Sequence, residues 1–463
     1  MSTFNSKQII ERQRGYFNSG VTRSVSFRLN ALENLSGALK LFEEKIEKAL
    51  YEDLGKSGME AFMTETGMVL EEIKYLKKHL KSLCKEKRVK TPLSQFPSKS
   101  FISPEPYGTV LILSPWNYPL QLCLSPLAGA IAAGNTVVLK PSSQSPATSA
   151  VIKDLIESIY SPEFVSVLLI DREETKELLE NKFDYIFFTG SKKGGQEVMS
   201  AAARFLTPVS LELGGKSPVV IDGTCSMALA ARRVAFGKVL NAGQTCVAPD
   251  YVLIKAGLEE EFSEHYLKAV KEFFPGGYDD YPKIISAPKF ERLKGLLTAS
   301  VKAGAVIHGA EKEITDDKNL KIYPLVLSSV GFDNPVMDEE IFGPILPLIS
   351  VKDMEEALSY VREHSKPLAL YLFTEDKGFE KRVLEAVSFG GGCINDTIVH
   401  LASTDMSFGG VGESGMGSYH GKASFDTFTH YRSILKKSVL IDLPMRYHPY
   451  NKKKKNLIER FMG

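Results

Sequence analysis

The chain has 463 residues, of which 43% are hydrophobic and 24% are charged, with 57 basic and 56 acidic side chains. This length exceeds what one hydrophobic core normally supports, so we expect a soluble protein of two or three domains. The net charge of +1 gives no reason to expect nucleic acid as a partner. Five widely spaced cysteines without CxxC spacing argue against a disulfide framework and against a metal site.

The first residues, Met1 to Arg14, carry charges and lack the apolar stretch of a secretory signal. No segment reaches the roughly 20 apolar residues that a membrane span needs. We therefore expect a cytoplasmic protein with no stable membrane anchor.

A helical pattern runs from Thr3 to about Lys87 and defines a first segment, residues 1–87. Its apolar residues recur at steps of three and four, as in an amphipathic helix, at Leu29, Leu32, Leu35, Leu39, Phe42 and Ile46. A second block, Gly58 to Lys85, is rich in lysine and glutamate. We expect these helices to cover a core and to carry no catalytic chemistry. Residues 88–106, with several prolines and β-like residues around Ser100 to Ser103, form a bridging segment.

Strands and helices alternate over residues 107–213, which predicts an α/β domain with a parallel sheet covered on both faces. The predicted strands are Gly108 to Ser114, Thr136 to Lys140, Val165 to Ile170 and Tyr185 to Thr189. The predicted helices are Leu120 to Ala133, Ala147 to Tyr160 and Glu173 to Glu180.

The same alternation continues over residues 214–405 and predicts a second α/β domain. Its predicted strands are Tyr251 to Ile254 and Leu368 to Phe373, and its predicted helices are Met227 to Leu240, Glu259 to Phe273, Pro288 to Ala303, Met354 to His364 and Lys377 to Ser388. Residues 406–445 are first glycine-rich and then β-like from Phe425 to Leu435. Residues 446–463 form a basic tail that we expect to be solvated.

One cysteine, Cys246, lies between a predicted helix and a predicted strand among small, turn-forming residues from Asn241 to Pro249. A thiol at such a corner can meet a substrate, although a lone cysteine is more often a packing residue. The remaining four cysteines have packing surroundings, so the case for Cys246 depends on other motifs.

Two further motifs supply polar groups that suit catalysis. Asn117 follows the first predicted sheet strand, where open α/β sheets bind ligands, and Pro115 and Pro119 hold it rigidly enough to donate to an oxyanion. Glu212 stands between two leucines and is followed by two glycines, so burial would raise its pKa toward that of a general base. Each residue alone is also compatible with an ordinary structural role.

Glycines after the strand that ends at Thr189 allow a ligand to approach the backbone near Gly190, Ser191 and Gly195, where a helix N-terminus favours a pyrophosphate. The spacing is not the GxGxxG fingerprint, so a tight turn is an equally good interpretation of this segment alone. Further along, Glu340 and Phe342 precede a turn at Pro344.

Together these motifs resemble the aldehyde dehydrogenase superfamily over nearly the whole chain. They occur in the family's order: Pro-Trp-Asn117, Lys140-Pro-Ser, Phe-Thr-Gly190-Ser, Glu212-Leu-Gly-Gly-Lys, Gly-Gln-Thr-Cys246 and Glu340-Ile-Phe342-Gly-Pro. The short N-terminus is similar to that of the class 3 branch, which implies a homodimer. The resemblance implies a Rossmann-like cofactor domain, a catalytic α/β domain and a small β element for oligomerisation, formed by residues 88–106 and 406–445.

The resemblance also implies residue roles. Cys246 would attack an aldehyde as a thiolate, and the Asn117 amide would stabilise the oxyanion. Glu212 would activate the water that hydrolyses the resulting thioester. Cofactor contacts are implied for Lys140 and Glu340 with ribose, for Phe342 beside the nicotinamide, and for Gly190, Ser191 and Gly195 near the pyrophosphate.

Ser143 departs from the pattern of many NAD-preferring relatives, which have a glutamate at this position. A carboxylate would repel a 2′-phosphate, whereas a serine can donate a hydrogen bond to one. We therefore predict that the cofactor is NAD or NADP, with Lys192 and Lys193 as possible additional contacts.

The expected substrate is a medium-chain aliphatic or aromatic aldehyde, because Ile394, Ile398, Val399 and Leu401 are apolar. Tyr118 and Thr245 are the candidate pocket residues, and His400 is better explained as a structural histidine than as a proton shuttle. Two alternatives remain. A CoA-acylating enzyme is disfavoured by Glu212, and a catalytically idle binding protein is disfavoured by the intact set of Cys246, Glu212 and Asn117.

Overall fold

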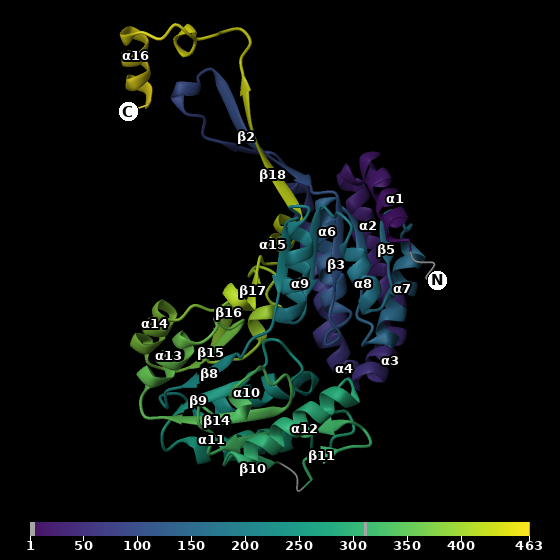
Figure 1. Ribbon diagram of the computed structural model, residues 1–463, viewed down its shortest axis with the longest axis vertical. Coiled ribbons are helices and arrows are strands. Elements are labelled where there is room, and N and C mark those ends of the chain that lie inside the picture. Colours follow the sequence, from purple (N-terminus) through teal and green to yellow (C-terminus); the bar gives the residue numbers. More distant parts are fainter. Residues whose placement is uncertain (1–4, 310–312, 463) are drawn as a thin grey trace.

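The structure is a computed structural model that describes residues 5–309 and 313–462. Two α/β lobes and a projecting β arm make up the molecule (Figure 1). Thr3 and Phe4, the start of the predicted helical stretch, lie outside the described residues.

The N-terminal layer consists of helices, as predicted. They are α1 (Ser6–Asn18), α2 (Val25–Leu41), α3 (Glu43–Leu54), α4 (Gly58–Ala61) and α5 (Gly67–Leu83), with a π-helical turn over Phe62–Thr66. The Ser24 side chain accepts a hydrogen bond from the Phe27 N–H and caps α2. Most of the predicted apolar stripe is buried, because Leu32, Leu35 and Ile46 are fully inaccessible.

The first lobe contains a six-stranded sheet in the order β17-β7-β6-β3-β4-β5, in which only β17 is antiparallel to its neighbour. Its strands are β3 (Thr109–Leu113), β4 (Thr136–Lys140), β5 (Val165–Val167), β6 (Tyr185–Thr189), β7 (Val209–Glu212) and β17 (Gly415–Met416). Its helices are α6 (Gln121–Ala133), α7 (Pro146–Ile159), α8 (Arg172–Leu179) and α9 (Lys192–Ala203). The predicted α/β class is confirmed.

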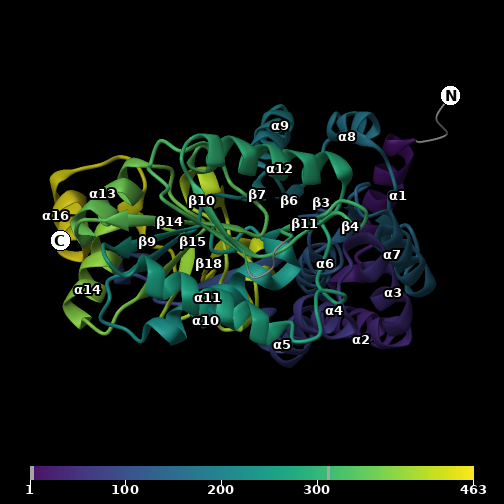
Figure 2. The same ribbon diagram turned by 90° about the horizontal axis from the view of Figure 1, so that it is seen from below.

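The second lobe contains a seven-stranded sheet in the order β10-β13-β14-β9-β8-β15-β16. Its strands are β8 (Pro218–Ile221), β9 (Tyr251–Lys255), β10 (Val306–Gly309), β13 (Leu325–Ser328), β14 (Ile345–Val351), β15 (Ala369–Phe373) and β16 (Gly391–Ile394). Its helices are α10 (Met227–Val239), α11 (Glu259–Phe273), α12 (Ala287–Lys302), α13 (Met354–Glu363) and α14 (Lys377–Ala386). Figure 2 shows α12 on one side of this sheet and α10 with α11 on the other.

Several strands were not predicted from the sequence, and proline or glycine explains three of them. Strand β8 begins at Pro218, β14 contains Pro347, and β16 begins with two glycines. Both residue types normally weaken a strand signal. Strand β5 is shorter than predicted, since it ends at Val167.

The arm is an antiparallel sheet of β1 (Lys87–Val89), β2 (Ser98–Pro106) and β18 (Thr429–Lys437), and it projects from the first lobe (Figure 1). The predicted β-like stretch from Phe425 begins instead inside a helix, α15 (Lys422–Thr427). The basic tail contains a helix, α16 (Lys452–Met462), and most of its described side chains are exposed. A small hairpin joins β11 (Thr315–Asp316) to β12 (Lys321–Ile322). No helix in the described part of the chain is long and apolar enough to cross a membrane.

Candidate active site

Cys246 lies on a sharply turned loop between α10 and β9. Three consecutive residues before it, Asn241, Ala242 and Gly243, have left-handed backbones with φ of 50°, 51° and 69°. Such angles are unfavourable for asparagine and alanine, and strain of this kind clusters at functional sites. A Cβ on Gly243 would lie 2.3 Å from the Gly343 carbonyl oxygen, so this turn requires glycine.

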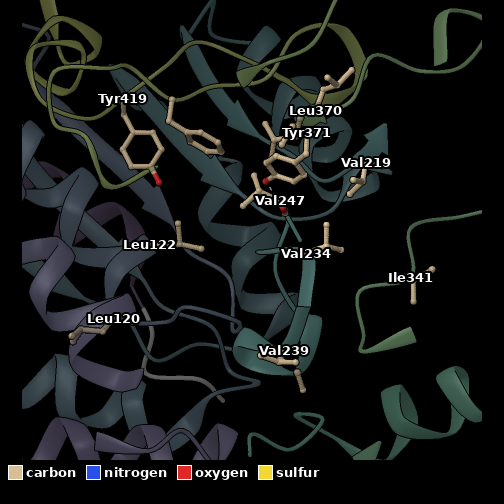
Figure 3. Packing of buried hydrophobic residues seen from close by; sticks show 14 of the residues in the cluster. Leu120, Leu122, Val219, Val234, Val239, Val247, Ile341, Leu370, Tyr371 and Tyr419 are labelled. Carbon is tan, nitrogen blue, oxygen red and sulfur yellow. Dashed lines mark hydrogen bonds between the residues drawn. The ribbon is translucent and has the colours of Figure 1, made fainter. Parts of the chain in front are cut away.

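Buried packing around the loop fixes its far side. The Tyr371 hydroxyl donates to the Val247 carbonyl at 2.5 Å, as Figure 3 shows. Both residues belong to a core in which Val234 and Leu370 are also nearly inaccessible. The loop is therefore held by hydrogen bonds and by packing immediately after Cys246.

A cavity of about 390 Å³ brings the predicted catalytic residues together. It is lined by Cys246, Glu212 and Asn117, which come from three different segments of the chain. The predicted cofactor residues Gly190, Ser191, Glu340 and Phe342 line the same cavity. The spatial grouping of these residues matches the expectation from the sequence.

The environment of Cys246 disfavours its thiolate. Burial first, and then the charges of Glu340 and Glu212, raise the pKa of the Cys246 thiol to about 12. The backbone N–H groups of Cys246 and Val247 act in the opposite direction by hydrogen bonding to the sulfur. The thiol is thus neutral near pH 7 and must lose a proton before it can attack a carbonyl.

Glu212 occupies the last position of β7 and is 2% exposed. Within the described chain, neither of its carboxylate oxygens has a hydrogen-bond partner. Burial therefore raises the pKa of Glu212 well above its ordinary value. An unpartnered buried carboxyl that faces a cavity is a strong candidate for proton transfer.

Asn117 follows β3 and is 4% exposed. Its side-chain N–H donates to the Gln244 carbonyl at 3.0 Å, two residues before Cys246. Its own backbone carbonyl accepts from the Asn241 side chain at 2.8 Å and from Lys56 Nζ at 3.2 Å. The side-chain amide therefore contacts the loop that carries the thiol, and two donors fix the backbone carbonyl of the same residue.

The polar end of this cavity fits a dinucleotide. Glu340 Oε1 is buried without a hydrogen-bond partner among the described residues, so it can accept from a sugar hydroxyl. Gly214 leaves the space beside it, because a Cβ there would lie 2.2 Å from Glu340 Oε2. Ser191 caps α9 by accepting the Gly194 N–H at 3.2 Å, which places a helix N-terminus at the cavity for a phosphate.

Three predicted cofactor residues lie outside the lining of this cavity. Lys140 ends β4 and is half-buried, and burial lowers its pKa. Ser143 is exposed in the loop that follows. Since β4 is the neighbour of β3, both residues lie at the same sheet edge as Asn117. Gly195 is buried, and a Cβ there would lie 2.7 Å from the Leu213 side chain, so its glycine permits α9 to pack closely.

Two cations that the sequence analysis did not single out also line the cavity. Lys289 Nζ lies 4.8 Å from the ring centre of Trp116, and Arg292 donates to the Glu339 carboxylate at 2.9 Å. Both come from α12 of the second lobe. No local motif marks them, because surface lysines and arginines are common on amphipathic helices. Trp116 and Phe342 complete the aromatic wall at a ring distance of 5.4 Å.

Lys216, the last residue of the Glu-Leu-Gly-Gly-Lys motif, supports the segment that carries Glu340. Its Nζ contacts Asp250 Oδ2 at 2.5 Å and donates to the Glu339 carbonyl at 2.9 Å. Asp250 Oδ1 accepts the Ile341 N–H at 3.0 Å. This ion pair therefore binds the backbone on both sides of Glu340 through hydrogen bonds.

A second cavity, of about 230 Å³, lies on the other side of Cys246 and is mainly apolar. Tyr118 and Thr245, the candidate pocket residues, both line it and are joined through their hydroxyl groups at 2.6 Å. The remaining lining includes Met63, Met68, Leu122, Phe236, Leu240, Ile398, Val399, Leu401 and Phe408.

An adjoining cavity of about 320 Å³ shares Met63, Met68, Leu401, Ala402 and His420 with the second one. The shared residues lie between the two cavities, which together we call the apolar passage, and the second cavity is the one that Cys246 lines.

His400 and Ile394 do not line these cavities. Burial lowers the pKa of His400 to about 4, so the ring is neutral near pH 7. Its Nδ1 lies 3.5 Å from the Cys393 sulfur. These contacts support the structural role that the sequence suggested for His400.

Known proteins resemble the chain over nearly its whole length. The model of the aldehyde dehydrogenase family matches residues 6–434. The 4,4'-diaponeurosporen-aldehyde dehydrogenase of Staphylococcus aureus is 46% identical over 443 residues, which are 95% of each protein. The Arabidopsis thaliana aldehyde dehydrogenase family 3 member H1 is 42% identical over 97% of this chain and 93% of that protein. A substrate-bound structure of Staphylococcus aureus AldH covers all of both chains with a TM-score of 0.96 and 44% identity.

Proposed function

The chain belongs to the aldehyde dehydrogenase family, in its class 3-like branch, and is an NAD(P)-dependent enzyme, and we propose that it oxidises apolar aldehydes to carboxylic acids. The observation that carries this proposal is the meeting of Cys246, Glu212 and Asn117 at one cavity. These side chains supply a nucleophile, a base and an oxyanion donor.

In the first step, the Cys246 sulfur forms a bond to the aldehyde carbon. The thiol proton leaves to solvent water, and the carbonyl electron pair moves to oxygen. The Asn117 amide and the Cys246 backbone N–H stabilise that oxyanion. The product is a thiohemiacetal on Cys246.

Glu340, Phe342, Gly190 and Ser191 line the cavity and would hold the nicotinamide cofactor. When bound, it would supply the hydride acceptor that oxidation of the thiohemiacetal carbon needs. The resulting thioester remains on Cys246 until Glu212 takes a proton from water. The water oxygen then attacks the acyl carbon, the carbon–sulfur bond breaks, and a carboxylic acid leaves.

The apolar passage beside Cys246 supports an aldehyde with a hydrophobic body. Medium-chain aliphatic and aromatic aldehydes fit the side chains of the second cavity, and longer apolar aldehydes would extend past Met63 and Leu401 into the adjoining one. The Staphylococcus aureus relative is named for 4,4'-diaponeurosporen-aldehyde, and we extend this preference for a hydrophobic aldehyde to the present enzyme.

We also propose that the enzyme is a cytoplasmic homodimer. Strands β16 and β18 are edge strands of their sheets, and an exposed edge readily pairs with another chain. All five cysteines in the described structure are free, as suits a reducing compartment. Light scattering of the purified enzyme would give twice the mass of 51.2 kDa, whereas a value near that of one chain would refute the dimer.

The activity is tested by absorbance at 340 nm with hexanal or benzaldehyde and either NAD or NADP. Wild-type enzyme should reduce the cofactor, and Cys246→Ser should not. Glu212→Gln should produce one burst of reduced cofactor and then stall, because deacylation needs the base. A wild type that is silent with a broad aldehyde panel would refute the proposal. Activity that appears only with added CoA would identify an acylating enzyme instead.

A further inference from the structure

The helical layer before residue 87 contributes a buried ion pair to the edge of the site. Lys56 and Glu65 both have 0% exposed side chains, and Lys56 Nζ lies 2.6 Å from Glu65 Oε1. Taking two charges out of water is costly, so a pair that is fully buried needs several compensating contacts. The sequence analysis expected this layer to cover a core, and it did not predict that a buried ion pair of the layer would contact the Asn117 segment.

The pair also makes hydrogen bonds and a cation–π contact with the segment that begins at Asn117. Lys56 Nζ donates to the Asn117 carbonyl at 3.2 Å and lies 4.0 Å from the ring centre of Tyr118. Glu65 Oε2 accepts the N–H groups of Leu120 and Gln121 at 3.0 and 2.9 Å. The two charges thus hold the Asn117 loop at its start and at the first turn of α6.

The local backbone is irregular where Glu65 lies. Residues Phe62–Thr66 form a π-helical turn between α4 and α5. Such turns are rare and occur frequently at functional sites, since one extra residue rotates the side chains that follow. From the same layer, Glu60 Oε1 accepts the Asn241 N–H at 2.7 Å, so the layer also contacts the loop of Cys246.

We propose that the Lys56–Glu65 pair is a positioning element that orients the Asn117 amide toward the aldehyde oxygen. The inference rests on the proposed function, in which Asn117 donates to the oxyanion. An oxyanion donor acts only when it is preorganised at the position of the developing charge. Because the pair binds the backbone on both sides of the Asn117–Gln121 segment, it sets that position without touching the substrate.

The test is the rate of the first turnover, measured by stopped-flow absorbance at 340 nm. The double variant Lys56→Met/Glu65→Gln removes both charges at similar size, which avoids leaving one charge buried alone. We expect its first-turnover rate to fall by roughly 10- to 100-fold, as a small displacement of a catalytic group can cause. The KM for the cofactor should change by less than about twofold, because the cofactor cavity does not include these residues.

Two further variants separate positioning from stability. Glu65→Gln alone keeps a carbonyl that can accept the Leu120 and Gln121 N–H groups, so it should retain more activity than the double variant. Arg28→Met is the matched control, because Arg28 is a buried cation of the same layer. Arg28 donates to the Thr22 carbonyl and to the Ala132 carbonyl, and Ala132 lies at the end of α6 that is opposite to the Asn117 segment. This control should lower the melting temperature and leave the first-turnover rate unchanged.

The decisive measurement is whether the effects of the double variant and of Asn117→Ala on the first-turnover rate are coupled. If the pair acts through Asn117, adding the double variant to Asn117→Ala should cause no further loss of rate, whereas independent effects would multiply. A folded double variant with a wild-type first-turnover rate would overturn the inference. If the double variant does not fold, Glu65→Gln is compared in the same way, and its smaller expected loss of first-turnover rate should likewise vanish in the Asn117→Ala background. An Asn117→Ala enzyme with full activity would instead show that the proposed oxyanion role itself has failed.

Discussion

The cofactor-facing cavity and the substrate-facing cavity meet at Cys246, and they are built from opposite kinds of side chain. The first contains carboxylate oxygens that have no hydrogen-bond partner among the described residues, two cations, and glycines that leave space for a ligand. The second is mainly aliphatic and aromatic, with a few hydroxyl groups close to the sulfur. A charged dinucleotide and a hydrophobic aldehyde can therefore reach one thiol without competing for the same surface.

The supporting contacts of the two sides are similar even though their linings differ. On the cofactor side, the Lys216–Asp250 pair holds the backbone around Glu340. On the substrate side, the Lys56–Glu65 pair holds the backbone after Asn117. In both cases the ion pair contacts the backbone beside the functional residue and not its side chain.

The largest effect should come from Cys246, which lines both cavities. Cys246→Ala removes the nucleophile, so kcat should fall by at least about 10⁴-fold. Cofactor binding, measured by fluorescence titration, should stay within about twofold of wild type, since Glu340 and the α9 N-terminus are untouched. A large loss of cofactor affinity would contradict the separation of the two sides.

Removing the base should give the next largest effect. Glu212→Gln should lower steady-state kcat by about 10²- to 10³-fold and leave the first turnover visible as a burst. Quenched-flow measurement of the acyl-enzyme would show it accumulating in the variant. A variant that loses the burst and the steady state equally would place Glu212 in the first step as well.

The pH dependence of the thiol follows from its raised pKa. Only the thiolate reacts with iodoacetamide, and the pKa of Cys246 is raised to about 12, so lowering the pH reduces the reactive fraction. The alkylation rate of the cofactor-free enzyme should rise about tenfold per pH unit between pH 6 and pH 9. Mass spectrometry of the modified peptide would separate Cys246 from the other cysteines. A plateau near neutral pH would show that the sulfur ionises far more easily than its burial implies.

A charge placed in the apolar passage should raise the KM for the aldehyde and leave the KM for the cofactor unchanged. Leu401→Lys puts an ammonium group at the passage shared by both apolar cavities, and KM for decanal should rise by about 10- to 100-fold. KM for the cofactor should not change. Val439→Lys is the control, because Val439 is an apolar side chain of the arm that is 97% exposed. Equal KM values for decanal in both variants would show that the aldehyde does not bind in the apolar passage.

The sequence predicted the proposed catalytic residues better than the residues that surround and support them. Cys246, Glu212 and Asn117 belong to compact motifs of small and turn-forming residues, so their grouping was predictable. Lys56 and Glu65 lie in a helical block where charged residues are ordinary, and their burial arises only when that block packs on the Asn117 loop. The same holds for Lys289 and Arg292, which reach the cavity from a separate lobe. The positions of both pairs depend on packing between distant segments, so no local sequence pattern predicts them.

The smallest expected effect concerns the choice between the two cofactors. Ser143 is exposed at the sheet edge next to Lys140, outside the lining of the main cavity. Ser143→Glu would place a carboxylate near a 2′-phosphate, and partly screened repulsion of this kind amounts to about 1 kcal/mol. Catalytic efficiency with NADP should therefore fall about 5- to 10-fold relative to NAD. Ser143→Ala separates charge from the loss of a hydroxyl and should change the ratio less. If both variants keep the wild-type ratio, the adenosine end of the cofactor lies away from Ser143, and the prediction that NADP is accepted loses its physical basis.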